Sequence, residues 1–140
     1  MPDIDKIRER FSSDRFAVQA AEALIDLAEP GHAVCSMELR PIHLNANSAP
    51  MGGAIFTLAD FAFAVASNAF SNRLTVTQQV SVNFLSAAKG RRLIAEARCL
   101  RQGHSSCFYT VEVQDELGAR AAYFTVNGRI LSPAAEGRKD

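Results

Sequence analysis

The spacing of apolar residues predicts a helix at the start of the chain and a hairpin after it. Residues 3 to about 18 have apolar side chains on one helical face, namely Ile4, Ile7, Phe11 and Phe16. The pair Ser12 and Ser13 can interrupt this helix. Between residues 20 and 44, Ala and Glu favour a helix, whereas "EPG" at 29–31 and the strand-like "HAVCSMEL" favour a hairpin. We expect the hairpin.

The most apolar stretch, "MGGAIFTLADFAFAVASNAF" at 51–70, holds a single charge, Asp60. Before it, "NANSAP" at 45–50 is rich in turn formers, and Pro50 disfavours helix in the residue ahead of it. The stretch predicts one long helix from about 53 to 69, capped by Asn68 or Asn72. Because this helix is apolar on nearly every side, the rest of the chain must enclose it.

The remainder of the chain has the pattern of four strands and a tail. Alternation is clearest in "VSVNF" and "TVEVQ", and Gly90, Gly103 and "DELG" supply turns. The expected strands are 74–86, 91–102, 105–115 and 119–131, with a frayed tail at 132–140. Five or six antiparallel strands can wrap one helix if the sheet is strongly curved. We expect one α+β domain over residues 1–140, with residues 1–19 as its N-terminal helix.

Composition and charge narrow the class of protein. The 140 residues have a formal net charge of zero, which argues against nucleic acid as a partner. The charged N-terminus and the interruption at Asp60 lead us to expect no secretion signal, no membrane span and a cytoplasmic protein. The three cysteines lie in apolar stretches, and we expect reduced core residues: Cys35, Cys99 and Cys107. The histidines lack metal-ligand spacing, so we expect no metal.

The stretch "HLNANSAPMGGAIFTLADFAFAVASN" at 43–68 resembles the signature of hotdog-fold acyl-CoA thioesterases of the phenylacetate-degradation (PaaI-like) type. That signature has Asn, a short loop, His-Gly-Gly and a helix with "FTLAD". The matching positions here are Asn45, Gly52, Gly53 and "IFTLAD" at 55–60. The resemblance covers roughly residues 20–131, including "VTQQVSVNFLSAAKG" and "CLRQGHSSCFYTVEV", and implies the hotdog fold. It departs at Met51, where the family has His, and at Val126, where it has Gly.

The resemblance implies hydrolysis of acyl-CoA thioesters to free acid and CoA, with no cofactor because CoA belongs to the substrate. It assigns Asp60 as nucleophile or general base and the Gly52 N–H as the group that polarises the thioester carbonyl. The residues agree, because glycines leave helix N-terminal N–H groups accessible and burial strengthens a carboxylate as a base. The alternatives are glycines that only shape a loop and an Asp that only bonds to a buried neighbour.

The resemblance extends to further site residues. Asn45 matches a residue that holds the water or the thioester, although a loop Asn can equally cap or close a turn. Thr77 matches the polar partner of the carboxylate, and strand alternation puts Gln78 on the opposite face. The implied coenzyme A contacts are Gly53, Ser86, Ala87, Ala88, Lys89, Arg101, Gln102, Gly103 and His104. The alternative for these contacts is ordinary turns with solvated charges.

The spacing of Gly52 and Asp60 bears on oligomeric state. Eight residues apart in the sequence, they lie about 12 Å apart along a helix. One carbonyl cannot be bound at Gly52 and attacked by Asp60 of the same chain, so the site must combine two subunits. The family forms such dimers, often paired into tetramers, and we expect a homo-oligomer, a dimer or a dimer of dimers.

Two other functions remain as alternatives. An acyl-thioester dehydratase or hydratase generally uses His paired with an acid, and Met51 removes the His nearest to the site. A non-catalytic acyl-CoA-binding protein would keep the pocket without turnover. An apolar acyl pocket could be lined by Phe56, Phe61, Phe63 and Met51, which could equally be core residues.

Overall fold

The computed structural model describes residues 2–133 and contains the long helix, the hairpin and the four later strands that the sequence predicts. The elements are α1 (Ile4–Phe11), η1 (Phe16–Ala20), β1 (Leu24–Glu29), β2 (His32–Glu38), η2 (Pro41–His43), α2 (Gly52–Asn68), β3 (Thr75–Phe84), β4 (Arg92–Gln102), β5 (Ser106–Asp115) and β6 (Arg120–Ile130). Of the expected tail, residues 134–140 lie outside the described residues.

The expected helix over residues 3–18 is wrong in its extent. α1 ends at Phe11, where the hydroxyls of Ser12 and Ser13 donate to the carbonyls of Glu9 and Arg10 and compete with helical bonds. The chain continues through the π-helical turn η1. There Phe16 is 70% exposed, so it does not extend the apolar face that Ile7 buries.

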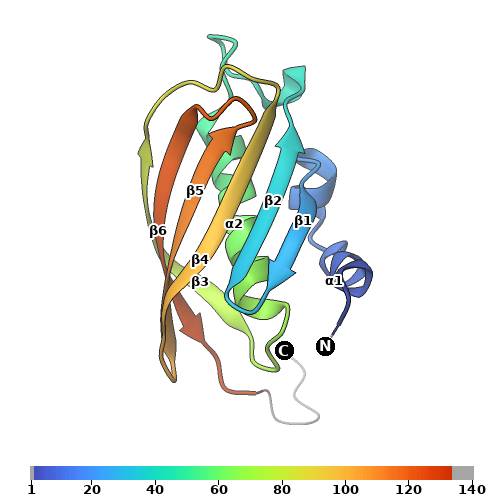
Figure 1. Ribbon diagram of the computed structural model, residues 1–140, viewed down its shortest axis with the longest axis vertical. Helices are drawn as coiled ribbons and strands as arrows, with labels where there is room; N and C mark the ends of the chain where they lie inside the picture. The colour runs from blue at the N-terminus through green and yellow to red at the C-terminus, as the bar shows by residue number, and fades with distance from the viewer. Residues whose placement is uncertain (1, 134–140) are drawn as a thin grey trace.

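The six strands form one antiparallel sheet in the order β1-β2-β4-β5-β6-β3. Figure 1 shows α2 behind this sheet, with the loop at residues 45–50 at one end of the molecule. α2 carries the chain from β2 to the far side of the sheet, where β3 begins. β1 and β3 are therefore the two edge strands.

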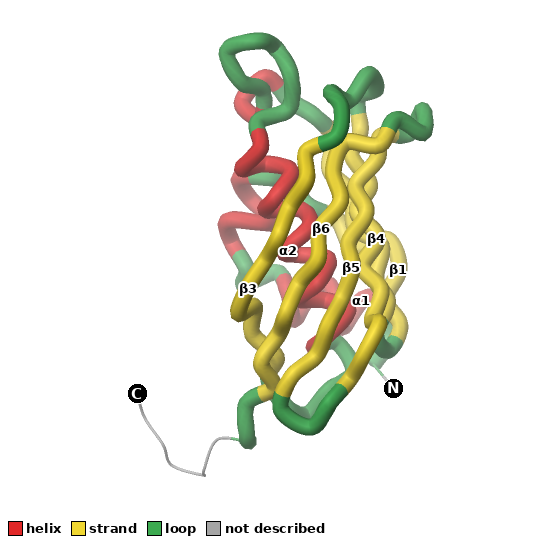
Figure 2. Tube along the Cα trace, turned by 90° about the vertical axis from the view of Figure 1, so that its left-hand side faces the viewer, coloured by secondary structure: helices red, strands yellow, loops and turns green. Residues whose placement is uncertain are grey.

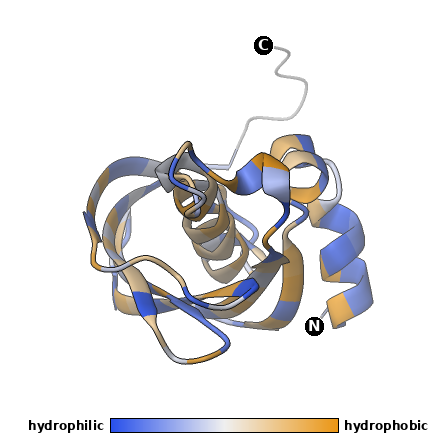
Figure 3. Cartoon of the chain, turned by 90° about the horizontal axis from the view of Figure 1, so that it is seen from above, coloured by the Kyte–Doolittle hydropathy of each residue, from blue (hydrophilic) through white to orange (hydrophobic). Residues whose placement is uncertain are grey.

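The sheet curves around α2, as the views in Figures 2 and 3 show. Leu58, Phe61 and Val65 of α2 are buried against the inner face of the strands. The helix lies close to β6 because Gly128 has no side chain; a Cβ there would lie 2.8 Å from a ring carbon of Phe63. The expected α+β architecture, a curved antiparallel sheet around one central helix, is confirmed.

Enclosure of α2 is incomplete within one chain. Gly53 and Phe56 are exposed, and Thr57 and Asp60 are only partly buried. These residues follow helical spacing and form a stripe that the sheet does not cover. The one charge of the long apolar stretch therefore lies at the open side of the helix.

Candidate active site

The N-terminus of α2 presents one free backbone donor. Met51 is the N-cap residue, and its sulfur accepts a hydrogen bond from the Gly53 N–H at 2.9 Å. The Met51 N–H itself donates to the carbonyl of His43 at 2.8 Å. Within residues 2–133, the Gly52 N–H has no acceptor. The residue that replaces the family's His thus occupies one helix N-terminal donor and leaves Gly52 with the positive end of the helix dipole.

A cavity of about 340 Å³ lies beside Gly52. The Phe84 ring covers the glycine so closely that a Cβ there would lie 3.2 Å from the ring. The cavity joins five of the sequence-predicted site residues, namely Asn45, Gly52, Ser86, Ala87 and Ala88. These residues come from the loop before α2, from α2 itself and from the segment after β3.

Asn45 closes its own loop in this structure. Its side-chain oxygen accepts hydrogen bonds from the N–H groups of Asn47 at 2.9 Å and Ala49 at 3.2 Å. This is the turn-closing geometry that the sequence left open as an alternative. Because Asn45 also lines the cavity beside Gly52, it shapes that cavity whether or not it contacts a substrate.

Asp60 and Thr77 form a second group, farther along α2. The Thr77 hydroxyl donates to an Asp60 carboxylate oxygen at 2.8 Å and links the helix to the edge strand β3. Burial raises the pKa of Asp60 above its usual range; the hydrogen bond from Thr77 opposes the rise, and the negative charge of Asp14 adds to it. The environment therefore favours a carboxylate that accepts protons more readily than an exposed one.

A bulge in β3 explains which residues face the helix. Thr77 pairs with Gly128 and Gln79 with Asn127, so Gln78 is an extra residue without a partner. Before the bulge the odd-numbered residues face α2, whereas after it Val80 and Val82 pack against the core. The sequence prediction that Thr77 rather than Gln78 faces Asp60 agrees with this geometry, although the bulge itself was not predicted.

The turn residue Asp115 positions the predicted coenzyme A segment and was missed by sequence analysis. Its buried carboxylate accepts hydrogen bonds from the N–H groups of Lys89 and Gly90 at 2.8 and 2.9 Å, and also from Leu117 and Ala119. Burial alone would raise its pKa, but these four bonds lower the pKa of Asp115 below its usual range. The only sequence signal was its place in "DELG", which predicted a turn and not this long-range contact.

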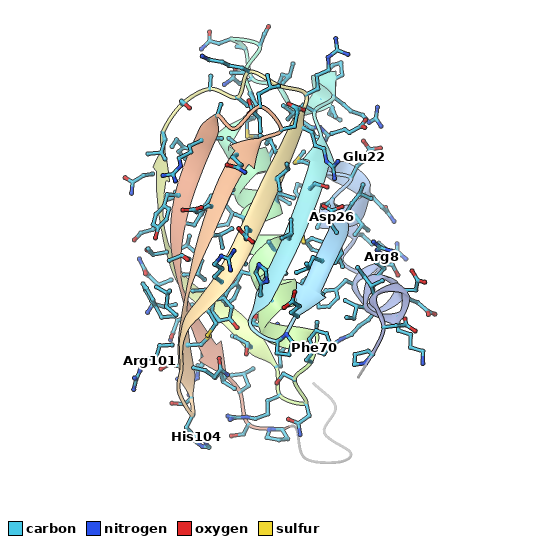
Figure 4. All side chains as sticks on the ribbon, viewed as in Figure 1. Arg8, Glu22, Asp26, Phe70, Arg101 and His104 are labelled. Atoms are coloured by element: carbon cyan, nitrogen blue, oxygen red, sulfur yellow. The ribbon has the colours of Figure 1, made fainter. Side chains whose placement is uncertain are left out.

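The second predicted coenzyme A group lies at the other end of the sheet. Ser86 to Lys89 precede β4, whereas Arg101 to His104 follow its last residues. Figure 4 shows Arg101 and His104 at the end opposite the loop that precedes α2. One chain therefore does not bring the two groups together.

The remaining predictions divide between core and surface. Phe61 and Phe63 are core residues, whereas Met51 and Phe56 are exposed. Cys35 and Cys107 are buried thiols whose pKa is raised by burial, but Cys99 is only partly buried, so the core prediction for it is wrong. Among residues 2–133 no cluster of His, Cys, Asp or Glu could hold a metal ion.

No helix among the described residues is long and apolar enough to cross a membrane.

A curved sheet around one helix, with a glycine pair at the helix start and a carboxylate on its open side, defines the hotdog class of proteins. The sequence model of the Thioesterase superfamily matches residues 51–122, about half of the chain. The chain is 32% identical over 113 residues to a protein of Archaeoglobus fulgidus named "Putative esterase", covering 80% of this chain and 73% of that one. The chain belongs to the thioesterase superfamily.

Solved structures agree with this assignment. The PaaI protein of E. coli, from the phenylacetic acid degradation operon, superposes with a TM-score of 0.84 over 92% of this chain and 94% of its own at 24% identity, a likeness in fold. The smu.793 protein of Streptococcus mutans UA159, solved with acetyl-CoA bound, has a TM-score of 0.74 and 26% identity, and the match covers 81% of this chain and 91% of that one. The chain is thus a PaaI-like thioesterase-superfamily protein.

Proposed function

We propose that this protein hydrolyses acyl-CoA thioesters to a free acid and CoA. The observation that carries the proposal is the Asp60 carboxylate, which is partly buried, bonded to Thr77 and accessible at the open edge of the fold. The free Gly52 N–H supplies the second requirement, a donor for the thioester carbonyl oxygen. The acetyl-CoA bound to the S. mutans relative supports coenzyme A as the carrier.

In the proposed reaction Asp60 acts on the thioester carbonyl carbon, either directly or through one water from which it removes a proton. The negative charge that develops on the carbonyl oxygen is stabilised by the Gly52 N–H. The carbon–sulfur bond then breaks, and the CoA sulfur leaves with a proton. Water supplies the oxygen and hydrogen of the acid in either route, so no redox partner is needed.

The proposed site lies between two subunits. Gly52 and Asp60 stand at positions 52 and 60 of one continuous helix, which keeps them about 12 Å apart. β3 connects to both groups, because Thr77 near one end bonds to Asp60 and Phe84 at the other end covers Gly52. If two copies pair antiparallel along β3, the Thr77 end of one strand lies beside the Phe84 end of the other. Such a homodimer brings Asp60 of one chain toward Gly52 of its partner.

The same pairing gives the two distant coenzyme A groups a common place. An antiparallel arrangement puts the Ser86 to Lys89 end of one chain next to the Arg101 to His104 end of the other. A substrate at the interface can then contact Lys89 of one subunit and Arg101 of its partner, whose cationic side chains suit phosphates. This agreement favours the two-chain site over solvated turns.

The first experiment is thiol release from acetyl-, hexanoyl-, palmitoyl-, phenylacetyl- and hydroxybenzoyl-CoA by the wild type and by Asp60→Asn. We expect turnover by the wild type and a loss of about 10²- to 10⁴-fold in the variant. The raised pKa of Asp60 means that the folded state binds a proton more tightly than the unfolded state, so stability falls as pH rises through that window. At neutral pH Asp60→Asn should therefore melt no lower than the wild type.

Two outcomes would contradict the proposal. Binding of the thioesters without turnover by the wild type would identify an acyl-CoA binder. An Asp60→Asn variant that fails to fold would make Asp60 a structural residue.

Complementation tests the two-subunit site. Proline is tolerated at the first position of a helix, so Gly52→Pro removes the N–H while α2 remains. Coexpression of Gly52→Pro and Asp60→Asn chains with different tags allows mixed dimers to be purified. Each mixed dimer has one complete site of two, and we expect about half of the wild-type turnover. Mixed dimers as inactive as either parent would show that the site lies within one chain.

A further inference from the structure

A second cavity, of about 440 Å³, lies on the other side of the α2 N-terminus from the one beside Gly52. Its lining comes from η1, η2 and the first turns of α2, and it consists of Phe16, Ala20, Ala21, Ile42, His43, Met51, Gly53, Ala54 and Thr57. Gly52 lines the first cavity and Gly53 the second, so adjacent residues of one helix turn separate the two. Its volume lies in the range typical of small-molecule sites.

The rim of this cavity is apolar and exposed. Phe16 is 70%, Ile42 82% and Met51 51% exposed, which is unusual for side chains of this size near one opening. The floor includes the small residues Ala20, Ala54 and Gly53, which leave the space unfilled. The three large side chains gain little from packing in the free chain and are available to a hydrocarbon ligand.

The polar groups in this cavity are already satisfied. His43 Nδ1 accepts from the Arg40 N–H at 3.1 Å, which leaves Nε2 to donate to the Ala20 carbonyl at 2.8 Å. The Thr57 hydroxyl donates to the Gly53 carbonyl at 2.8 Å. A ligand hydroxyl placed among these groups would lose its water without a new partner, which is unfavourable. The cavity therefore fits a hydrocarbon and disfavours a hydroxylated group.

We infer that this cavity holds the acyl group of the substrate and selects unsubstituted acyl chains of medium length over short or hydroxylated ones. This inference rests on the proposed function, in which the thioester carbonyl lies at the Gly52 N–H. From that point the coenzyme A arm follows the cavity beside Ser86, and the acyl chain passes Met51 into the second cavity. Met51 lies at the passage because it caps Gly53 and lines the acyl side.

The test measures kcat/KM for acetyl-, hexanoyl- and 5-hydroxyhexanoyl-CoA. We expect hexanoyl-CoA to exceed its hydroxylated analogue by about 10- to 100-fold, the range over which an apolar pocket rejects a hydroxyl. Ala20→Leu and Ala54→Leu fill the cavity from two elements. Each should lower the ratio of hexanoyl to acetyl turnover by about tenfold or more, because several methylenes lose their apolar environment.

Gln19→Leu is the matched control, since it places the same side chain on η1 at an exposed position outside the cavity lining. Its hexanoyl to acetyl ratio should equal that of the wild type. Equal ratios in the folded Ala20→Leu and Ala54→Leu variants would overturn the inference while leaving hydrolysis intact. A change in oligomeric state without a change in ratio would assign the cavity to a second copy of the chain and also overturn it. No turnover of any thioester by the wild type would overturn the proposed function itself.

Discussion

The two edges of the sheet are treated differently by the chain. On β1, the Arg8 side chain from α1 donates from Nε and Nη2 to the Ile25 carbonyl at 3.0 and 2.8 Å. α1 lies beside this edge in Figure 1, and Figure 4 labels Arg8 there. β3 has β6 on one side and no strand on the other among residues 2–133.

The difference indicates where a second copy binds. An uncovered edge strand tends to pair with another chain, and proteins usually protect such edges. Here the protected edge is remote from the candidate active site, whereas the open edge carries Thr77 and ends at the cavity beside Gly52. The open edge is therefore the one that the proposed chemistry needs.

The largest expected effect comes from the backbone donor at the open side. Gly52→Pro should lower kcat by about 10²- to 10³-fold, as loss of one oxyanion donor does. Gly52→Ala is the matched control, because it adds the same Cβ 3.2 Å from the Phe84 ring but keeps the N–H. The measurement is steady-state thiol release with circular dichroism as the check on folding. Equal losses in the two variants would assign the effect to crowding by the side chain.

The second prediction places the same charge on each edge. Val76 of β3 is 37% exposed and Leu24 of β1 is 58% exposed. Val76→Glu should weaken the dimer by about 1 kcal/mol per chain, or roughly 30-fold in dissociation constant for two chains. Leu24→Glu should change neither association nor turnover. Sedimentation velocity over a concentration series measures both variants, and equal behaviour of the two edges would contradict the proposed interface.

The comparison also shows what the sequence can predict. α2 and the last four strands were predicted within a few residues because their apolar periodicity is long and regular. The placement of Thr77 opposite Asp60 agrees with simple alternation only because the bulge at Gln78 comes after it. The four hydrogen bonds of Asp115 were not predictable, since two of its donors, Lys89 and Gly90, lie in another turn. Ser12 and Ser13 ended α1 where helix propensity alone would continue it.

The third prediction concerns the pH dependence of turnover. Asp60 must be ionised to act, and its raised pKa puts the acid limb of kcat/KM above the ordinary aspartate value of about 3.9. Thr77→Val removes the bond that opposes the rise and should move the limb to higher pH. Asp14→Asn removes a like charge and should move it to lower pH. A pH profile of each variant tests both signs, and shifts in one common direction would contradict the role of Asp60 as the titrating group.

The smallest expected effect is at the protected edge. Arg8→Ala leaves the Ile25 carbonyl without its charged donor, and we expect a loss of about 1 kcal/mol in the free energy of unfolding, since water can reach part of this edge. Turnover per folded molecule should not change, because β1 is the edge remote from Asp60 and Gly52. Urea unfolding and thiol release measure the two quantities on the same sample. A drop in turnover at unchanged stability would mean that α1 acts on the site and that the two edges are not independent.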